Sequence, residues 1–524
     1  MRAVSIPFEF MRRARIGMKR VKKLILNTIV LTVSALVVRT IGLAFNAYIT
    51  GKVGAAGMGL FGLIMTVYSL GITFASSGIR TATTRLIVSE DARGGRGNRA
   101  VMRRCIAFAL FVSVSVCALM FVTAPFVGRV WIDDVRTVNA LRILAFSLPF
   151  IAVSATLSGY FLTKGSSVKM ASIQMVELVV RIVICVALLT MYIDRGIEYA
   201  CAAIAIGSTV SELCSCLLAW ALCSGEMRRK SSEKPVTERI FSKVVRIAVP
   251  EAFGAWIKSI LITIEHVLIP SGLKKSGSSA DAALASYGLV SQMAFPLLLY
   301  PSCILTSLST LLIPEIARSH TLGNHKHIRY MAVKTLRLAL IFSFGVAGLF
   351  CFFSEPLALA VYGNTDTAVY LRLFAPLIPV MYIDMTVDGI LKGLDQQVRV
   401  MRISILDAAL SALLVWILVP RYALAGYLIT IFAGEIVNFY LSLRALLRIA
   451  DVRLHIMRDV ALPILCICAA TLPLGILFRY TGGGAAMIFV FAAAAMALYY
   501  VQLRMTSCID KEDARWFRSI FKSG

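Results

Sequence analysis

The sequence is poor in charged residues, and above all in acidic ones. Only 16% of its 524 residues are charged, and 54 Lys and Arg stand against 28 Asp and Glu, which gives a formal net charge of +26. Polar residues are scarce as well, because 59% of the chain is hydrophobic and the mean hydropathy is +0.81. A soluble domain, including one that binds DNA through a basic face, needs more polar surface than this. The composition therefore predicts a polytopic membrane protein.

Motifs of catalysis and of ATP hydrolysis are missing too. There is no P-loop, HExxH or GxSxG, and GxGxxG occurs only at 57–62, in an apolar run where close helix packing is the better interpretation. The twelve cysteines lie mostly in apolar runs and predict no disulfide framework. His320, His325 and His327 share one loop, which fits a solvated loop better than a metal site. We expect neither an enzyme nor an ATP-driven pump, and no cofactor apart from a coupling ion, Na⁺ or H⁺.

Apolar runs of about 20 residues, the length of a membrane-spanning helix, occur fourteen times. They lie near 24–49, 57–79, 105–127, 143–163, 170–193, 199–223, 245–269, 284–307, 335–354, 370–391, 403–419, 424–443, 459–478 and 483–503. With the N-terminus inside, 41 of the 54 Lys and Arg fall in inside segments and ten in outside segments, as the positive-inside rule requires. The remaining three, Arg39, Arg181 and Lys258, lie within spans. The sequence predicts a multi-pass protein with both termini in the cytoplasm.

An internal duplication relates the two halves of the chain. At an offset of 230, residues 141–177 match 371–407 without a gap and with eight identities. At an offset of 226, FGL at 61–63 matches YGL at 287–289, and TTRLI at 83–87 matches STLLI at 309–313. Two copies of six spans enter the membrane from the same side, which is typical of a carrier that works by alternating access.

The predicted fold is an all-α membrane protein with fourteen transmembrane helices, in two pseudo-symmetric six-helix lobes plus two C-terminal helices. Its predicted segments are a basic cytoplasmic tail (1–23), an N-lobe of spans 1–6 (24–223), a cytoplasmic linker (224–244), a C-lobe of spans 7–12 (245–443), spans 13 and 14 (459–503) and a second cytoplasmic tail (504–524).

Basic residues within spans indicate where an anion could bind. A charge inside the membrane is costly, so it is expected to face a cavity or a partner. Arginine presents a planar fork to phosphate oxygens, and we predict that Arg39, Arg181 and Lys258 hold an anionic head group. Glu177 and Arg181 are four residues apart, which fits a private salt bridge equally well.

Acidic residues within spans indicate where a coupling cation could bind. Asp384 and Asp388 are one helical turn apart, and such a pair suits a proton or a sodium ion. Glu251 and Glu265 share one face of span 7 with Lys258, and we assign both to the ion-coupling set. Glu177 and Asp407 are secondary candidates, and Glu212 and Glu435 complete the acids inside spans.

Two segments resemble a known family. Residues 54–90 read GAAGMGLFGLIMTVYSLGITFASSGIRTATTRLIVSE, and residues 287–317 read YGLVSQMAFPLLLYPSCILTSLSTLLIPEIA. Both resemble the signature of the stage V sporulation protein B type of polysaccharide-biosynthesis flippases, in the multidrug/oligosaccharidyl-lipid/polysaccharide exporter superfamily. In the lipid II flippases of this superfamily, span 1 carries two basic residues six positions apart. Arg39 matches the first, Phe45 stands at the second, and Arg80 stands where the family usually has proline.

The resemblance implies fourteen helices in a bacterial cytoplasmic membrane and the flipping of a lipid-linked cell-wall or polysaccharide precursor, with a link to the spore cortex. Its expected partners are a polyprenyl-pyrophosphate-linked saccharide, membrane lipid and cell-wall synthesis enzymes, and no nucleic acid. Two alternatives stay open: a cation-coupled multidrug exporter of small organic cations, and a membrane scaffold that recruits cell-wall enzymes through its basic loops.

Overall fold

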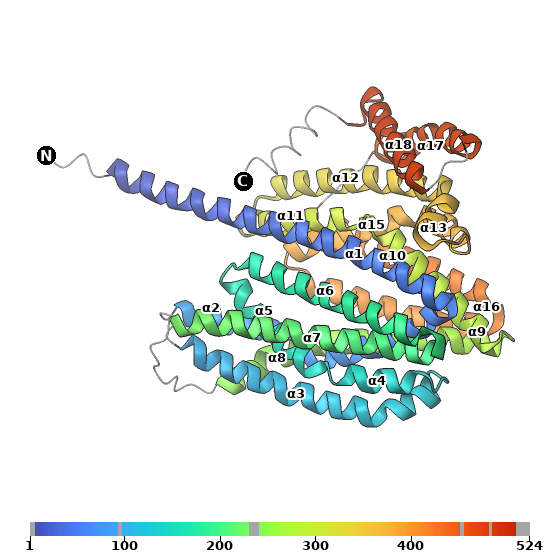
Figure 1. The fold of residues 1–524 in the computed structure, drawn as a ribbon. Coiled ribbons are helices and arrows are strands. Elements are labelled where there is room, and N and C mark those ends of the chain that lie inside the picture. Colours follow the sequence, from blue (N-terminus) through green and yellow to red (C-terminus); the bar gives the residue numbers. More distant parts are fainter. Residues whose placement is uncertain (1–5, 93–96, 230–239, 451–454, 482–484, 510–524) are drawn as a thin grey trace.

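The computed structural model describes residues 6–92, 97–229, 240–450, 455–481 and 485–509, with side chains in the first helix described from Val33 onward. The predicted tails (1–23 and 504–524) and the predicted linker (224–244) lie partly outside the described residues. Within this part of the chain all regular structure is helical, and long helices run side by side (Figure 1). This confirms the predicted all-α fold.

The α-helices are α1 (Ile6–Ser76), α2 (Ile79–Ala92), α3 (Asn98–Phe126), α4 (Thr137–Ala145), α5 (Leu148–Thr163), α6 (Ser167–Tyr192), α7 (Ile197–Arg229), α8 (Ile240–Lys275), α9 (Ala280–Tyr287), α10 (Phe295–Leu299), α11 (Cys303–Thr321), α12 (His325–Phe352), α13 (Ser354–Tyr362), α14 (Ala368–Phe374), α15 (Ile378–Gly393), α16 (Gln397–Ala450), α17 (Leu462–Thr481) and α18 (Ala485–Met505). Between them lie π-helical segments at Val127–Trp131, Gly288–Ala294 and Met457–Ala461, and 3-10 turns at Ile193–Arg195 and Ala375–Leu377.

The described helices account for fourteen spans. Eleven are long and apolar enough to cross a membrane, and the pair α4 and α5, bent by 42°, makes up to twelve. Two of these, α1 and α16, contain a break with positive φ, at Gly54 (69°) and Ala423 (51°). In Figure 1 the first half of α1 runs from left to right, whereas α2, which follows the second half, lies at the left. Counting each broken helix as two spans gives the predicted fourteen.

The reversal in α16 is tight. A Cβ on Gly426 would lie 2.4 Å from the carbonyl oxygen of Leu418, so only glycine lets the two halves approach this closely. Further along, a Cβ on Gly434 would lie 2.9 Å from the hydroxyl of Ser411. Spans 11 and 12 therefore form a close antiparallel pair.

The internal duplication is visible in the helix boundaries. Moving the bounds of α5 by 230 residues gives those of α15, and residue 167, where α6 begins, maps onto 397, where α16 begins. The left-handed residue between these helices corresponds as well, Gly165 (φ 61°) in one copy and Asp395 (φ 59°) in the other. The sequence repeat is therefore also a repeat of local structure.

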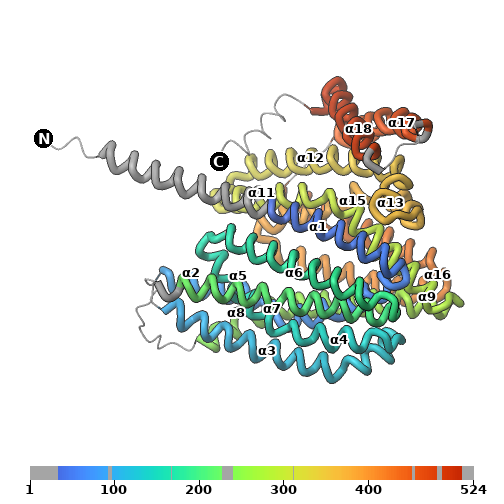
Figure 2. The backbone as a smooth tube through the Cα atoms, viewed as in Figure 1, coloured from blue at the N-terminus to red at the C-terminus, as the bar shows by residue number. Residues whose placement is uncertain are grey.

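The first span of each copy touches both halves of the bundle. In Figure 2, α1 lies beside α9 and α11, and α8 lies in the lower part with α2 and α3. Ile240, Val244 and Ala248 of α8 belong to the same apolar core as Tyr160 and Phe161. Farther along, α8 packs on α16. One helix thus links the N-terminal core to the second copy.

The last two spans are attached to α12. A Cβ on Gly348 would lie 2.3 Å from the side chain of Ile467 in α17, and the hydroxyl of Tyr499 in α18 donates to the carbonyl of Ile341. Arg337 forms an ion pair of 2.9 Å with Asp459, with side chains only 10% and 5% exposed. Arg337, which the count of basic residues assigns to an inside segment, is buried within α12.

The two ends of the bundle carry different loops. The turns at 323 and 394–396, together with α2, lie at the left of Figure 1, and the turns at 132–136 and 276–279 lie at the right. We call these the inner and the outer end, after the sides that the positive-inside rule predicts for them.

Candidate functional site

The charged residues within the spans gather in separate groups. The N-lobe triad consists of Glu177 and Arg181 of α6 and Glu212 of α7. The Arg181 guanidinium donates to Glu177 at 2.6 Å and to Glu212 at 3.4 Å, and its Nε donates to the Ser211 hydroxyl at 3.3 Å. The predicted pair of Glu177 and Arg181 is present, and Glu212 is a second acidic partner that spacing along one helix could not assign. Two carboxylates share one cation here.

A second group lies in the later half of the chain. We call it the C-lobe acidic cluster: Glu265 of α8, Asp384 and Asp388 of α15, and Asp407 and Glu435 of α16, together with Lys258 of α8. Each member lies within electrostatic range of at least two others, and for Glu265 these are Asp407 and Glu435. With five carboxyl groups and one ammonium group, the cluster favours a bound cation.

Asp384 is the least exposed residue of this cluster. It is 8% exposed, and Asn438 of α16 donates to its Oδ2 at 2.9 Å. Its Oδ1 has no hydrogen-bond partner among the described residues. A buried carboxylate oxygen without a donor is costly, so this atom is suited to take up a proton or a cation.

Asp388 is the more open carboxylate of the predicted pair. It is one turn from Asp384 and lies 3.9 Å from the ammonium of Lys392, whose side chain is half exposed. A 3-10 turn that contains Pro376 lies between α14 and α15 in the same span.

Arg39 lies at the break in span 8. That span is interrupted twice, by the π-helical segment Gly288–Ala294 and by the turn between α10 and α11. The Arg39 guanidinium donates to the carbonyl of Leu299 at 2.9 Å, and Thr40 shares a hydrogen bond of 2.7 Å with Tyr300. The predicted head-group arginine thus satisfies backbone exposed by the break.

The charged stripe of span 7, formed by Glu251, Lys258 and Glu265, faces other helices. Glu251 accepts a hydrogen bond of 2.7 Å from Thr81 of α2, which ties α8 to span 2. Lys258 and Glu265 lie in the C-lobe acidic cluster. His266, one position off the stripe, pairs through Nδ1 with the Tyr287 hydroxyl at 2.9 Å. The stripe therefore contacts both copies.

The predicted site residues are thus not brought to one place. Arg39, Arg181 and Lys258 lie in three settings, each beside a carbonyl or carboxyl groups. The ion-coupling candidates Asp384, Asp388 and Glu265 do lie together, with Asp407. Glu251 lies apart from them at the contact with Thr81. The sequence did not lead us to Asn438. The available signal was that it is a polar residue three positions after Glu435.

Spans 2 and 8 pack closely, backbone against backbone, in the outer half of the bundle. A Cβ on Gly59 would lie 2.0 Å from the carbonyl oxygen of Leu284, and one on Gly288 would lie 2.2 Å from that of Ala55. Gly62 approaches the side chain of Gln292 in the same way. The glycines of the GxGxxG sequence therefore serve close helix packing, as expected.

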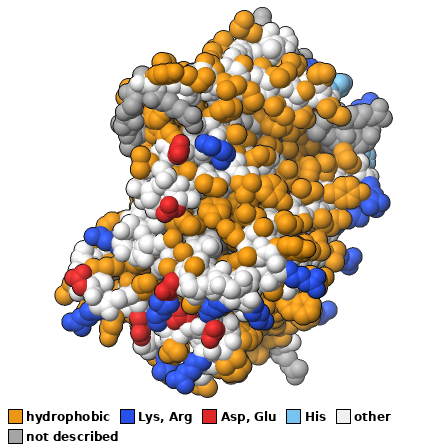
Figure 3. Space-filling model, turned by 90° about the vertical axis from the view of Figure 1, so that its right-hand side faces the viewer, with side chains coloured by type: hydrophobic (Ala, Val, Ile, Leu, Met, Phe, Trp, Pro, Cys, Tyr) orange, Lys and Arg blue, Asp and Glu red, His pale blue; other side chains and the backbone are white. Residues whose placement is uncertain are grey.

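Ion pairs join the two copies at the outer end. Arg136 binds Asp134 at 2.6 Å and Asp281 at 3.4 Å, and Lys274 binds Asp133 at 3.1 Å. Side chains of both signs lie next to one another on this face (Figure 3). The hydrogen bonds that the Arg136 guanidinium donates to the Asp134 carboxylate raise the pKa of Arg136. A base with a raised pKa keeps its charge until the pH exceeds that value, so alkaline conditions do not break the pairs of Arg136 with Asp134 and Asp281.

The loop histidines do not form a metal site. In the part of the chain that the structure describes, no group of three or more His, Cys, Asp and Glu residues is arranged to hold a metal ion. His327 lies 3.7 Å from Glu315, while His320 and His325 face another side of the loop.

Comparison with protein families identifies the chain. Residues 24–320, more than half of it, match the family model described as "Polysaccharide biosynthesis protein". The chain belongs to this family. Residues 276–418 also match the model described as MatE.

Curated relatives of this polysaccharide biosynthesis family member extend over most of its length. "Stage V sporulation protein B" of Bacillus subtilis (strain 168) is 26% identical over 504 residues, which cover 93% of this chain and 96% of the relative. "Lipid II flippase MurJ" of the same organism is 22% identical over 406 residues, covering 72% of this chain and 73% of the relative.

Among solved structures, "Lipid II flippase MurJ, inward closed conformation" superposes with a TM-score of 0.69 at 15% identity, covering 91% of this chain and 98% of that one. This likeness shows a shared fold, and the polysaccharide biosynthesis family member is a multi-pass membrane protein.

Proposed function

We propose that this protein is a flippase that moves a lipid-linked saccharide or peptidoglycan precursor across the bacterial cytoplasmic membrane by alternating access. Its substrate is a polyprenyl-pyrophosphate-linked saccharide, whose lipid tail stays in the bilayer while the head group crosses. The membership in the polysaccharide biosynthesis family carries this proposal. It is supported by the names of the relatives, one a lipid II flippase and one a sporulation protein. The expected setting is cell-wall or spore-cortex synthesis, with both termini in the cytoplasm and cell-wall synthesis enzymes as partners.

The head group is proposed to bind Arg39, Arg181 and Lys258 in turn, and the existing contacts suggest how they become available. Arg181 is bound to Glu177 and Glu212, so a phosphate must displace two carboxylates to reach it. Taking up a proton or a sodium ion neutralises a carboxylate and weakens its hold on the guanidinium. Cation binding would thereby release Arg181 for the pyrophosphate.

The test is transport of a labelled polyprenyl-pyrophosphate saccharide in vesicles that contain the purified protein. Losing a charged contact to phosphate costs about 1.5–3 kcal/mol, so Arg39→Ala, Arg181→Ala and Lys258→Ala are each expected to slow transport by roughly tenfold or more. Arg195→Ala, an exposed arginine at the outer end, is the matched control and should transport normally. Normal transport by all three span variants would reject the head-group assignment, and absence of transport by the unaltered protein would reject the flippase.

A second candidate is a cation-coupled exporter of small organic cations. The excess of carboxylates in the C-lobe acidic cluster and the match to the MatE model favour it. In this case overproduction raises resistance to cationic dyes, and Asp384→Asn abolishes that resistance. A dedicated flippase leaves resistance unchanged.

A further inference from the structure

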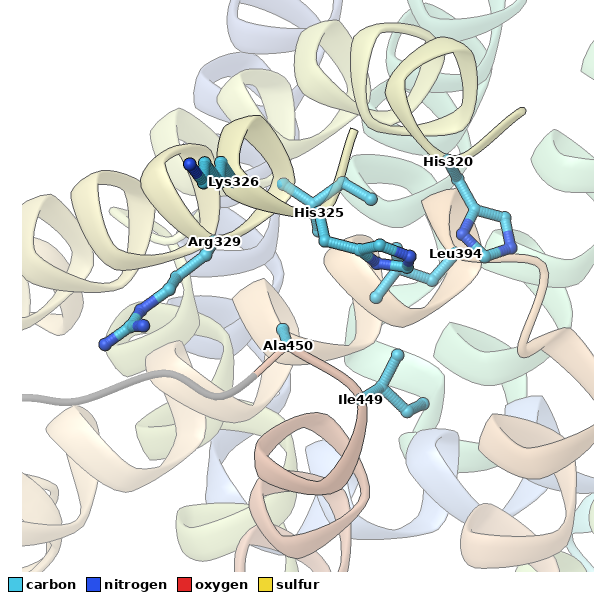
Figure 4. A pocket seen from close by; sticks show the side chains of 8 residues that line it. His320, His325, Lys326, Arg329, Leu394, Ile449 and Ala450 are labelled. Carbon is cyan, nitrogen blue, oxygen red and sulfur yellow. The ribbon is translucent and has the colours of Figure 1, made fainter. Parts of the chain in front are cut away.

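A pocket of about 260 Å³ opens at the inner end of the bundle, away from the charged groups within the spans. It lies where the end of α11, the start of α12, the turn after α15 and the end of α16 meet. Its lining residues are His320, His325, Lys326, Ile328, Arg329, Leu394, Ile449 and Ala450. In Figure 4 the rings of His320 and His325 lie near Leu394, and Arg329 lies on the other side, near Ala450.

The described residues that line this pocket carry charge of one sign. Four of these eight side chains are basic, and none of the eight is acidic. The neighbouring carboxylate, Glu315, contacts His327, which does not line the pocket. Each imidazole ring carries an N–H group that can donate a hydrogen bond to an anion, as the Lys326 ammonium and the Arg329 guanidinium can. The side chains thus offer a concentrated set of donors to an anion.

The start of α12 adds to the same field. This helix of 28 residues begins at His325, and Asn324 caps it by accepting a hydrogen bond from the backbone of His327. The positive end of the helix dipole therefore lies at the pocket, where it reinforces Lys326 and Arg329. The basic side chains and the helix end act on one space.

The base of the pocket is apolar. Ile328 is 3% exposed and Leu394 is fully buried, and Ile449 and Ala450 complete this side. A ligand that contacts both the basic side and the apolar base carries a phosphate next to less polar atoms. A compact phosphate contacts the basic side alone and leaves the apolar base empty. Both share the chemistry of phosphate oxygens held by basic donors.

We propose that this pocket is a binding site for a phosphate-bearing ligand, either the head group of an anionic phospholipid or a soluble pyrophosphate. The site is separate from the proposed transport path, because none of its residues belongs to the N-lobe triad or the C-lobe acidic cluster. It gives the protein a way to sense the lipid or the phosphate at its inner surface.

The experiment measures binding to the purified full-length protein. One arm titrates inorganic pyrophosphate by calorimetry. The other compares nanodiscs of phosphatidylcholine with nanodiscs containing phosphatidylglycerol, and counts retained phospholipid by native mass spectrometry. The pocket variant is His325→Gln with Lys326→Gln. The control is Arg399→Gln with Arg402→Gln, which removes two exposed positive charges from α16 near the same end without touching the pocket.

Saturable binding that the pocket variant weakens by about tenfold, and the control does not, supports the site. Weakening in the pyrophosphate arm alone identifies a soluble phosphate, and weakening in the phosphatidylglycerol arm alone identifies a lipid head group. The proposal is overturned if neither ligand binds, or if the control weakens binding as much as the pocket variant. Transport measurements do not enter this result, so it stands or falls independently of the flippase.

Discussion

At the scale of single residues, the intramembrane charges are defined by their partners. The sequence marks Arg39, Arg181 and Lys258 as unusual because each lies in an apolar run, and this much follows from composition alone. Which carbonyl or carboxylate each one meets depends on how distant helices pack. Arg39 meets Leu299, 260 residues away, and no spacing rule gives that contact.

Asp384 allows a test in which stability and transport change in opposite directions. Asp384→Asn removes a buried charge whose Oδ1 lacks a donor, and we expect it to raise the free energy of unfolding by about 1 kcal/mol. The same change removes the cation site, so transport should lose its dependence on a proton or sodium gradient.

Thermal unfolding in detergent and transport with each gradient in turn give the two readouts. Asp366→Asn, which lies in the turn before α14, is the control and should leave both unchanged. A variant that is less stable, or that still responds to the gradient, contradicts this role of Asp384.

At the scale of helices, the sequence predicts most of the fold because its signals are local. A run of 20 apolar residues must form a helix to satisfy its backbone in lipid, and the repeat at 230 residues reproduces the bounds of α5 and α15. The breaks within span 8 were not predicted. Carbonyls at these breaks accept hydrogen bonds from side chains of distant segments, namely Arg39, Tyr362 and Tyr382, which is a tertiary property.

The packing of span 2 on span 8 gives a prediction at this scale. A Cβ on Gly288 would overlap the carbonyl of Ala55, so Gly288→Ala must push the outer halves of these spans apart. A change of ~1 kcal/mol in the free-energy difference between the closed and the open arrangement of these spans changes the population of the open arrangement about fivefold. We therefore expect faster alkylation of a cysteine introduced by Gln292→Cys.

Gly51→Ala is the matched control, since a Cβ there meets nothing within 4 Å. Both variants should be compared, at equal thermal stability, with the protein that carries Gln292→Cys and no glycine substitution. Equal alkylation rates for Gly288→Ala and Gly51→Ala would contradict the idea that glycine packing holds this end closed.

At the scale of the whole molecule, two kinds of contact hold the copies together at the outer end. The ion pairs involve Asp133 and Asp281, whose side chains are 74% and 73% exposed, and exposed pairs contribute about 0–1 kcal/mol each. The apolar core that includes Leu60, Leu63 and Tyr287 is buried. Burial of such side chains contributes about 1.5–3 kcal/mol each. Apolar packing, not charge, therefore dominates the closed outer end.

Salt separates these contributions. At 1 M ionic strength the Debye length is about 3 Å, which screens the exposed pairs and leaves the core intact. The rate at which the cysteine introduced by Gln292→Cys is alkylated should therefore change less than about twofold between low and high salt. Adding the double substitution Asp133→Asn with Asp281→Asn should also change this rate by less than about twofold. A marked opening in high salt would show that the ion pairs hold the lobes.

The broken backbone of span 8 also constrains how the protein is made. The carbonyls of Met293 and Leu298 accept hydrogen bonds from Tyr362 and Tyr382, which are synthesised 69 and 84 residues later. During synthesis, span 8 therefore enters the membrane before its own donors exist. Until spans 9 and 10 arrive, Arg39 and Thr40, already inserted with span 1, provide the partners that Leu299 and Tyr300 can use. Span 1 is thus in place to bind span 8 before the rest of the second copy is made.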